Sequence, residues 1–301
     1  MELEKCELCP RRCGVNRRLG ERGFCQAGEL PEVALVSLHP WEEPCLVGAN
    51  GAGTVFFSHC NLRCVFCQNQ EISQQGSGVA ISVERLAEIF LEQQARGAAS
   101  LDLVTPTHYV PQIIAALKIA GEKGLSLPVV YNSNAYETVA TIESLRGYVD
   151  VFLPDMKYAA ETSACRYSAA PGYFTAAAAA IERMVDIAGE PVFAAGQMKR
   201  GVLIRHLILP GQMKESMRLV DWIWRSFGDA VYVSLMNQFT PLHRVKEYPE
   251  INRHLTTYEY DKVVNYAWDR GIRQAFIQEG RTASEKFVPH FDGAGVKPAA
   301  R

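Results

Sequence analysis

Three cysteines lie close together in the stretch HCNLRCVFCQN, directly after an apolar run at 54–57 that is expected to form a strand. Cys60, Cys64 and Cys67 follow the spacing C-x3-C-x2-C. Three thiolates on one compact loop can hold three corners of an iron–sulfur cube. Because this loop has no fourth cysteine, one iron would keep the open position that a catalytic metal site needs. The alternative is a zinc site completed by a more distant ligand such as His59.

A second group of cysteines stands near the N-terminus. Its members are separated by two, three and eleven residues: Cys6, Cys9, Cys13 and Cys25. Such short spacings indicate metal ligation rather than disulfides in a chain without a secretion signal. Four thiolates form a closed set that suits zinc or an iron–sulfur cluster, and the arginines between residues 11 and 18 favour zinc. Residues 1–32 are therefore predicted to be a cysteine-rich segment that a second metal, zinc or iron–sulfur, helps to order.

The composition limits the class of protein. The chain has 301 residues, of which 48% are hydrophobic and 21% charged, enough apolar side chains for a large core. The formal net charge of −2 argues against binding nucleic acid through a strongly basic surface. No apolar run approaches the roughly 20 residues needed to cross a bilayer, and the N-terminus has no apolar signal core. We therefore expect a cytoplasmic protein without a membrane partner.

Apolar runs that look like buried strands alternate with helical patterns from residue 54 onward. This alternation is typical of βα units and a parallel sheet, and six strong units with a weaker seventh predict a full or partial barrel. The strands are expected at 33–37, 54–57, 101–104, 128–132, 149–153, 201–209, 230–235 and 273–277, and the helices at 82–95, 111–120, 137–145, 173–188, 214–227 and 257–270. Residues 33–285 are predicted to form this domain, and the pattern-free residues 286–301 a loose C-terminal tail.

Polar residues follow several of the predicted strands. In barrels of parallel strands the active site lies at the carboxyl ends of the strands, so these residues are candidates for a site. They are Thr105 and Thr107, Asn132 and Asn134, Asp155 and Lys157, Arg205, and Gln238. In a regular strand Arg205 and His206 point to opposite faces, which predicts Arg205 in the lumen and a structural role for His206. Glu42 and Glu43, close to Trp41 and His39, are expected to be solvated loop carboxylates, the alternative being that they line the mouth of the substrate site.

The cysteine pattern resembles the signature of the radical S-adenosylmethionine (SAM) superfamily. It follows the first strand of a βα repeat, and an aromatic residue, Phe66, precedes the third cysteine. In detail the chain resembles the activating enzymes of pyruvate formate-lyase, and among them relatives with an N-terminal cysteine cluster. The resemblance covers most of residues 54–280 and implies an α/β fold, a partial (β/α)6 TIM-type barrel. It also implies a [4Fe-4S] cluster on the three cysteines, which cleaves SAM reductively to a 5′-deoxyadenosyl radical that abstracts a hydrogen atom.

The resemblance implies roles for individual residues. Phe66 would pack near the adenine of SAM, and Asp155 with Lys157 resembles a SAM-binding pair, the alternative being a plain loop ion pair. Arg205 would contact a carboxylate or form a structural ion pair. Gln238 stands where the activating enzymes have a ribose-contacting histidine.

At two further places the chain matches the activating enzymes less closely. Asn132 and Asn134 are either site residues or turn formers. Activating enzymes carry Gly-Gly-Glu-Pro after the second strand, whereas this chain has TPTHYVP at 105–111. Backbone contacts to SAM near Thr105 and Thr107 need only a suitable chain path, but the glutamate has no counterpart.

The resemblance implies an oxidoreductase of anaerobic metabolism that is reduced by a flavodoxin- or ferredoxin-like donor. Its substrate would be a glycine of a partner glycyl-radical enzyme, or else another protein, a peptide or a small molecule. A function of a different class is also open: a non-catalytic iron–sulfur or zinc protein. Such a protein would have no use for polar residues at so many strand ends.

Overall fold

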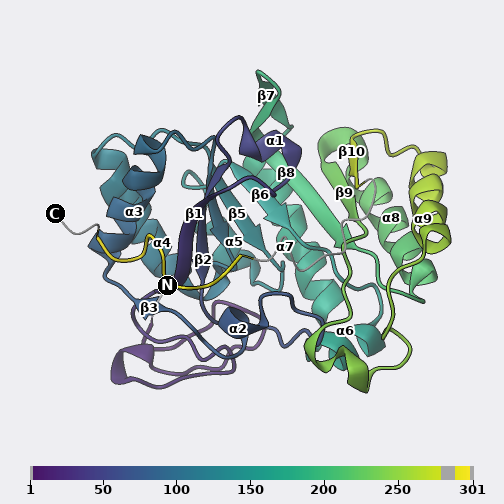
Figure 1. The fold of residues 1–301 in the computed structure, drawn as a ribbon, viewed down its shortest axis with the longest axis horizontal. Helices are drawn as coiled ribbons and strands as arrows, with labels where there is room; N and C mark the ends of the chain where they lie inside the picture. The colour runs from purple at the N-terminus through teal and green to yellow at the C-terminus, as the bar shows by residue number, and fades with distance from the viewer. Residues whose placement is uncertain (1–2, 279–288, 299–301) are drawn as a thin grey trace.

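A parallel sheet forms the centre of the protein in this computed structural model, which describes residues 3–278 and 289–298 (Figure 1). The parallel strands are, in spatial order, β2 (Ala52–Phe57), β4 (Leu101–Val104), β5 (Val129–Ser133), β6 (Val151–Pro154), β8 (Gln197–Leu207), β9 (Tyr232–Met236) and β10 (Ala275–Ile277). Antiparallel strands extend it: β1 (Glu32–His39) beside β2, β3 (Val79–Ala80) beside β1, and β7 (Val192–Ala194) beside β8. Pairing runs from β10 to β3 without joining these two ends within the described residues, which confirms the predicted α/β partial barrel.

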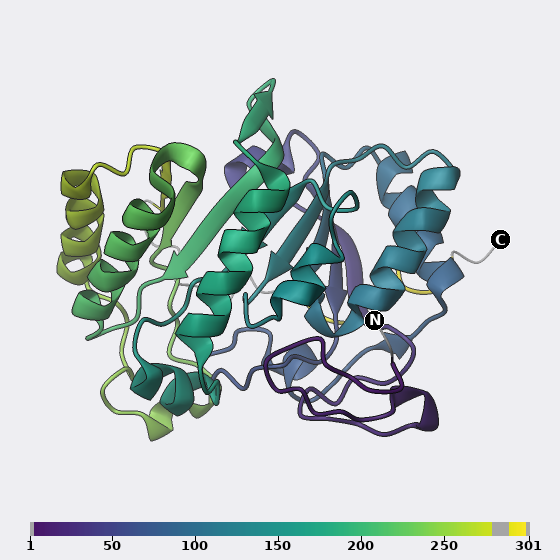
Figure 2. The same ribbon diagram turned by 180° about the vertical axis from the view of Figure 1, so that it is seen from behind.

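Helices cover the outer face of the sheet (Figure 2). Those that the sequence predicts are α3 (Val83–Ala95), α4 (Val110–Glu122), α5 (Val139–Glu143), α7 (Tyr173–Ala188), α8 (Met213–Phe227) and α9 (Thr257–Arg270). The main core lies between these helices and alternate strand residues such as Val55, Leu103 and Tyr131, all fully buried. Because side chains alternate across a strand, their neighbours point into the lumen.

The strands and helices predicted from periodicity are all present, with ends shifted by a few residues. Several elements of two to eight residues escaped prediction, because runs of that length carry little periodicity and these lie outside the regular alternation of strands and helices. These are β3, β7, α1 (Pro44–Val47), α2 (Gln70–Ser73) and α6 (Glu161–Ser168), with the 3-10 turns η1 (Arg17–Leu19), η2 (Thr107–Tyr109), η3 (Gly228–Ala230) and η4 (His243–Glu247).

The C-terminal tail is not loose where the structure describes it, so that expectation was wrong. The backbone N of Val36 donates to the carbonyl of Ala294 (2.9 Å), and Gly293 N donates to the carbonyl of Ala34 (3.0 Å). Val296 is fully buried. Hydrogen bonds to β1 therefore hold the tail at residues 293 and 294, while residues 286–288 and 299–301 of the predicted tail, and 279–285 of the predicted barrel domain, lie outside the described residues.

Helix α1 covers the amino end of the lumen. Figures 1 and 2 show α1 and β7 at one end of the sheet and the described part of the N-terminal segment, residues 3–31, at the other. Cys45 and Leu46 of α1 are buried against Val130 and Leu203, two lumen-facing strand residues. The remaining space in the lumen therefore lies toward the carboxyl ends of the strands.

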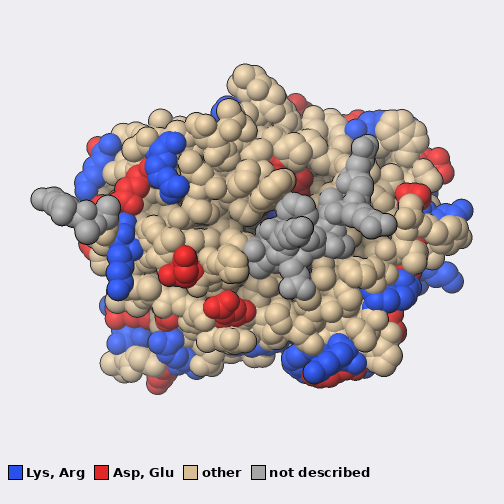
Figure 3. All heavy atoms as spheres, in the orientation of Figure 1, with Lys and Arg blue, Asp and Glu red and all other residues tan. Residues whose placement is uncertain are grey.

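Charged side chains of both signs are interspersed around the edge of the face shown in Figure 3, in keeping with the small net charge. In the described part of the chain, no helix is long and apolar enough to cross a bilayer.

Candidate functional site

The cysteine loop, residues 60–67, leaves the carboxyl end of β2 and leads toward α2. Local hydrogen bonds define its path. Arg63 Nη1 donates to the carbonyl of Cys60 (2.7 Å), and Gln74 Nε2 donates to the carbonyl of Cys64 (2.9 Å). The side chain of Asn61 is buried and donates to the carbonyl of Tyr136 (2.6 Å), which ties the loop to the segment after β5.

Hydrogen-bonding groups surround all three sulfurs of the cysteine loop. Asn134 Nδ2 and the Leu62 backbone N donate to Cys60 Sγ (3.4 Å each), Ser168 Oγ donates to Cys64 Sγ (3.0 Å), and Cys67 Sγ shares a hydrogen bond with Ser73 Oγ (3.3 Å). Burial, reinforced by the neighbouring Cys64, raises the pKa of Cys60 to about 12, so the thiolate needs a bound cation to persist. Donors to thiolate sulfur are the groups that tune iron–sulfur clusters. The donor set therefore fits such a cluster.

The part of the chain that the structure describes gives no support for a site that binds a single metal ion. Within the described residues, no group of three or more His, Cys, Asp or Glu side chains is arranged to hold one metal ion. His59, the alternative zinc ligand, is engaged elsewhere, since its Nε2 lies 3.0 Å from Glu32 Oε2. The second metal at the N-terminal cysteines stays a prediction.

A cavity of about 360 Å³ opens beside Cys64 and Cys67 and follows the lumen. Its wall brings together most of the residues predicted to bind a cofactor. These are Phe66, Asn132, Asp155, Lys157, Arg205 and Gln238. Polar residues from the ends of separate parallel strands therefore meet at the cysteine loop, as barrel geometry requires.

Asp155 is the centre of an ion-pair network in this cavity. Lys157 Nζ lies 2.7 Å from its Oδ2, and Arg205 Nε lies 2.9 Å from its Oδ1. Burial opposes ionisation, but the charges of Arg205 and Lys157 hold the pKa of Asp155 below its ordinary value. Arg205 also donates to Glu42 Oε1 (3.0 Å) and Asn132 Oδ1 (2.6 Å). All three guanidinium nitrogens are thus used within the protein, so Arg205 forms a structural ion pair.

Glu42 is not a solvated loop carboxylate, so that expectation was wrong; it lies in the cavity wall, as the alternative had it. Its side chain is only 11% exposed, because Arg205 and the Nδ2 of Asn132 (2.9 Å) bind it inside the lumen. Glu43 is buried too, and burial raises its pKa to about 7. Asp102 lies fully buried nearby, and burial and the charge of Glu42 raise its pKa well above the ordinary value.

The rest of the cavity wall is largely aromatic and amide. Phe66 packs at a tilt against Phe239, with ring centres 5.8 Å apart. Gln238 Oε1 accepts a hydrogen bond from Gln278 Nε2 (3.2 Å). Sequence reasoning missed Phe239, and also Phe56, Gln68, Asn69 and Leu207, whereas His39 and Trp41 lie in the wall beside Glu42.

His206 confirms the alternation predicted for β8. Its Nδ1 lies 2.8 Å from the carbonyl of Met156, and its Nε2 lies 2.9 Å from Ser216 Oγ. Burial lowers the pKa of His206 to about 4, so the ring is neutral. It therefore supports the packing of α8 on the sheet and does not face the cavity.

Three predicted cofactor-binding residues do not line the main cavity. Asn134 bonds to Cys60 Sγ, as described, and Thr105 N donates to the carbonyl of Asn132 (2.9 Å) with Thr105 in the left-handed region at φ 59°. Thr107 donates to the buried Glu137 and lines a second, smaller cavity, which it shares with the N-terminal cysteines. The stretch at 105–111 thus faces the N-terminal segment.

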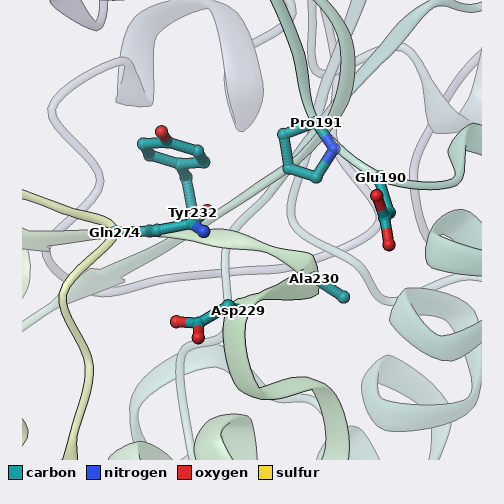
Figure 4. A pocket seen from close by; sticks show the side chains of 6 residues that line it. All are labelled: Glu190, Pro191, Asp229, Ala230, Tyr232 and Gln274. Atoms are coloured by element: carbon teal, nitrogen blue, oxygen red, sulfur yellow. The ribbon is translucent and has the colours of Figure 1, made fainter.

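A further pocket, of about 390 Å³, lies at the amino ends of β9 and β10 (Figure 4). It is lined by Glu190, Pro191, Asp229, Ala230, Tyr232 and Gln274. None of the predicted site residues belongs to it, and it lies at the end of the sheet opposite the cysteine loop. We assign no chemistry to it.

Comparison with known proteins places the chain in a family. No family model matches it. The uncharacterized protein MJ0674 of Methanocaldococcus jannaschii is 33% identical over 275 residues, which are 88% of this chain and 75% of that protein. The chain belongs to the MJ0674 family. Identity at this level over most of both chains implies that the MJ0674 family shares the fold described above.

Solved structures show which wider fold the MJ0674 family has. Streptococcus suis SuiB bound to its precursor peptide SuiA aligns with a TM-score of 0.51 and 16% identity, over 73% of this chain and 46% of SuiB. SuiB bound to S-adenosylmethionine aligns with a TM-score of 0.51 and 13% identity, over 73% of this chain and 48% of SuiB. The MJ0674-family chain therefore has the barrel fold of SuiB, and it spans less than half of SuiB's length.

Proposed function

We propose that this protein is a radical SAM enzyme. A [4Fe-4S] cluster binds to Cys60, Cys64 and Cys67, and SAM occupies the adjoining cavity. The observation that carries the proposal is a three-cysteine loop with hydrogen-bonded sulfurs, set in the wall of a cavity of about 360 Å³. The fold shared with SuiB, which has been solved with SAM bound, supports it.

The cavity residues would bind and orient SAM. When bound, the cluster supplies the electron that splits SAM into methionine and a 5′-deoxyadenosyl radical. Phe66 and Phe239 offer the adenine an apolar wall. Lys157 and Asp155 present opposite charges to the carboxylate and amino groups of SAM, and Gln238 presents an amide to the ribose.

The test is formation of 5′-deoxyadenosine. We expect the full chain, reconstituted without oxygen with iron and sulfide and reduced with dithionite, to release 5′-deoxyadenosine and methionine from SAM. Lys157→Ala should weaken SAM binding, measured by calorimetry, whereas Cys165→Ala, an exposed thiol outside both cysteine sets, should match the wild type. A protein with a complete cluster that releases no 5′-deoxyadenosine would refute the proposal.

We propose a peptide or protein segment as the substrate, with a glycine of a glycyl-radical enzyme as one form of it. SuiB, solved with its precursor peptide, supports this class. The exposed Trp41 at the cavity wall offers such a segment an aromatic contact. Deuterium transfer from a labelled peptide into 5′-deoxyadenosine would identify it, and a glycyl radical in a partner would give a characteristic paramagnetic doublet. We propose a flavodoxin- or ferredoxin-like protein as the electron donor.

A non-catalytic iron–sulfur or zinc protein is the second candidate. It leaves the buried network of Asp155, Lys157, Arg205 and Glu42 beside the cysteine loop without a purpose. Metal analysis separates the two, because a zinc protein would lose zinc and not iron on replacement of Cys60, Cys64 and Cys67. We further propose that residues 1–32 form a metal-binding segment attached to a barrel domain of residues 33–285.

A further inference from the structure

We propose that two buried tyrosines, Tyr158 and Tyr173, are positioning residues for the site. Tyr158 acts on the cysteine loop through Ser168, and Tyr173 acts through the backbone on the pair formed by Asp155 and Lys157. The inference rests on the proposed function, because that function gives this pair its role in binding SAM. Neither tyrosine lines the main cavity, and both belong to the core between the sheet and its helices.

The four residues after β6 explain how one segment reaches both sides of the sheet. Asp155 and Lys157 lie in the cavity wall. Met156 and Tyr158 alternate with them and are buried in the main core. The segment stays extended past the end of the strand, because Met156 N donates to the carbonyl of Arg205 (2.8 Å) on the neighbouring β8. Successive side chains of an extended chain point to opposite faces, so the pair proposed to bind SAM and a tyrosine of the helix side are neighbours in the chain.

Tyr158 is linked to a sulfur of the cysteine loop by two hydrogen bonds in series. Ser168 Oγ lies 3.0 Å from Cys64 Sγ and 2.7 Å from the Tyr158 hydroxyl. A serine hydroxyl has a single proton, so Tyr158 is the donor to Ser168 when Ser168 donates to the sulfur. Burial raises the pKa of Tyr158 well above its ordinary value, which keeps the phenol protonated. Each hydrogen bond in such a series polarises the next, so Tyr158 strengthens the bond that Cys64 receives.

The end of α6 keeps Ser168 in place. Its backbone pairs with the cysteine loop, since Arg63 N donates to the carbonyl of Ser168 (3.0 Å) and Val65 N donates to the carbonyl of Tyr167 (2.8 Å). Ser168 is fully buried. The direction of its hydroxyl therefore depends on Tyr158 and not on solvent.

The hydroxyl of Tyr173 lies among three backbone groups near the lumen. It accepts a hydrogen bond from Lys157 N (3.0 Å), and its oxygen lies 2.7 Å from the carbonyl oxygen of Asp155 and 2.9 Å from that of Asn134. The single phenolic proton is shared between these two carbonyls. Asn134 in turn donates to Cys60 Sγ (3.4 Å). Tyr173 thus sets the spacing between the backbone that carries the SAM pair and the backbone that carries a donor to the cysteine loop.

Packing leaves the ring of Tyr173 little freedom. It stacks on the ring of Tyr136 with centres 6.1 Å apart and meets the ring of Tyr158 edge-on at 5.5 Å. Gly172 N donates to both carboxylate oxygens of Glu161 (2.9 and 3.0 Å), which fixes the start of α7. Phenylalanine would fill the same space, and burying a hydroxyl is costly unless it is hydrogen-bonded. The hydroxyls, rather than the rings, therefore carry the positioning role.

Binding of SAM tests the role of Tyr173. The full chain is reconstituted without oxygen with iron and sulfide, and its affinity for SAM is measured by calorimetry. Tyr173→Phe should weaken SAM binding by about tenfold, the size of one lost hydrogen bond. The KM for SAM should rise to the same extent, while kcat stays within about threefold and the iron content is unchanged. A residue that only stabilised the fold would not separate KM from kcat.

Tyr260→Phe is the matched control. The Tyr260 hydroxyl, on α9, donates to the carbonyl of Leu235 (2.7 Å), so this variant also loses a buried tyrosine hydroxyl that bonds to the backbone. Its affinity for SAM should equal that of the wild type. If Tyr173→Phe does not fold, Glu161→Ala, at an exposed position, loosens the start of α7 and should weaken SAM binding by about threefold. Wild-type affinity in Tyr173→Phe, or in Glu161→Ala where that variant is needed, would overturn the role of Tyr173.

A double variant shows whether Tyr173 acts through the SAM pair. In the Lys157→Ala background, Tyr173→Phe should weaken SAM binding by no more than about twofold further, because the ammonium group that it positions is already gone. A further tenfold loss in this background would mean that Tyr173 acts by another route, and would overturn the proposal for this residue.

The midpoint potential of the cluster tests the role of Tyr158. Tyr158→Phe should lower the potential in a redox titration by less than Ser168→Ala does, because it weakens the donor to Cys64 without removing it. In the Ser168→Ala background it should have no further effect. Its affinity for SAM should stay within about twofold of the wild type, the opposite pattern to Tyr173→Phe. An unchanged potential in Tyr158→Phe would overturn the role of Tyr158.

These measurements separate this inference from the proposed function. A wild type that releases 5′-deoxyadenosine, beside tyrosine variants with unchanged SAM affinity and potential, would overturn the inference and leave the proposed function intact. A wild type with a complete cluster that binds SAM but releases no 5′-deoxyadenosine, beside variants that show the two expected changes, would do the reverse.

Discussion

The cysteine loop and the N-terminal cysteines differ in what surrounds their sulfurs. In the cysteine loop, hydroxyl and amide groups such as Ser168 and Asn134 contact the sulfurs, and one side opens to the lumen cavity. Around the N-terminal cysteines there are few hydroxyls, but Arg17 and Arg11 lie close by and the adjoining cavity is small. The comparison teaches that the cysteine loop has room for a substrate beside its sulfurs, whereas the N-terminal cysteines adjoin a small cavity and keep one thiol, that of Cys13, exposed at the surface.

The largest expected effect is on the rate of 5′-deoxyadenosine formation, which should distinguish the cysteine loop from the N-terminal cysteines. Cys64→Ala should lower the rate of 5′-deoxyadenosine formation by about a thousandfold or more, equivalent to about 4 kcal/mol, because it removes a ligand of the catalytic cluster. Cys13→Ala should leave a measurable rate under dithionite, which reduces the cysteine loop's cluster directly. Equal losses in both variants, in single-turnover assays on folded protein, would break the distinction.

The next effect concerns stability. Arg17→Met removes the charged donor that bonds to the Gly28 and His108 carbonyls, and should destabilise the protein by about 3 kcal/mol. Thermal unfolding and protease cleavage within residues 1–32 would both report it. Arg12→Met, at an exposed position of the same segment, is the control and should change neither. If the two variants unfold alike, Arg17 does not anchor the segment.

A pH effect should arise beside the smaller cavity. Burial raises the pKa of Glu137 to about 7 although Thr107 and Tyr131 donate to it. The unfolded chain ionises near pH 4.5, so the stability contributed by the protonated folded form is lost as pH rises through about 7. Glu137→Gln cannot ionise, and its stability relative to the wild type should rise between pH 5 and 8 by up to about 3 kcal/mol. A pH-independent difference in denaturant midpoints would contradict this.

The smallest effect should appear in the redox potential. Ser168→Ala removes the hydroxyl that donates to Cys64 Sγ at 3.0 Å. Losing a donor to thiolate sulfur disfavours the more negative, reduced cluster, so the midpoint potential should fall while 5′-deoxyadenosine formation stays within a few-fold. A redox titration measures it, with Ser144→Ala, a serine on the outer helix layer, as control. An unchanged potential would mean that this hydrogen bond does not tune the site.

The sequence predicted those parts of the site whose members are neighbours in the chain. The cysteine loop and the Asp155–Lys157 pair each lie within one strand end, and barrel topology then brings strand ends together. The ion pair of Glu42 with Arg205 could not be predicted, because Glu42 reaches the lumen only after β1 pairs antiparallel with β2 and α1 folds over the amino end. The outward turn of Thr107 depends in the same way on a distant partner, the N-terminal segment.

The contacts of the N-terminal segment also set an order of events during synthesis. The carbonyl of Leu8 accepts hydrogen bonds from Thr138 and Thr141, and Arg11 donates to the carbonyl of Ala169, so these partners lie 130 to 158 residues later in the chain. This segment leaves the ribosome before the barrel that follows it, and can therefore reach its final place only after half of the barrel has been made. Until then its four thiols have no folded surroundings, and the nascent chain must be kept from oxidants and from stray metal ions.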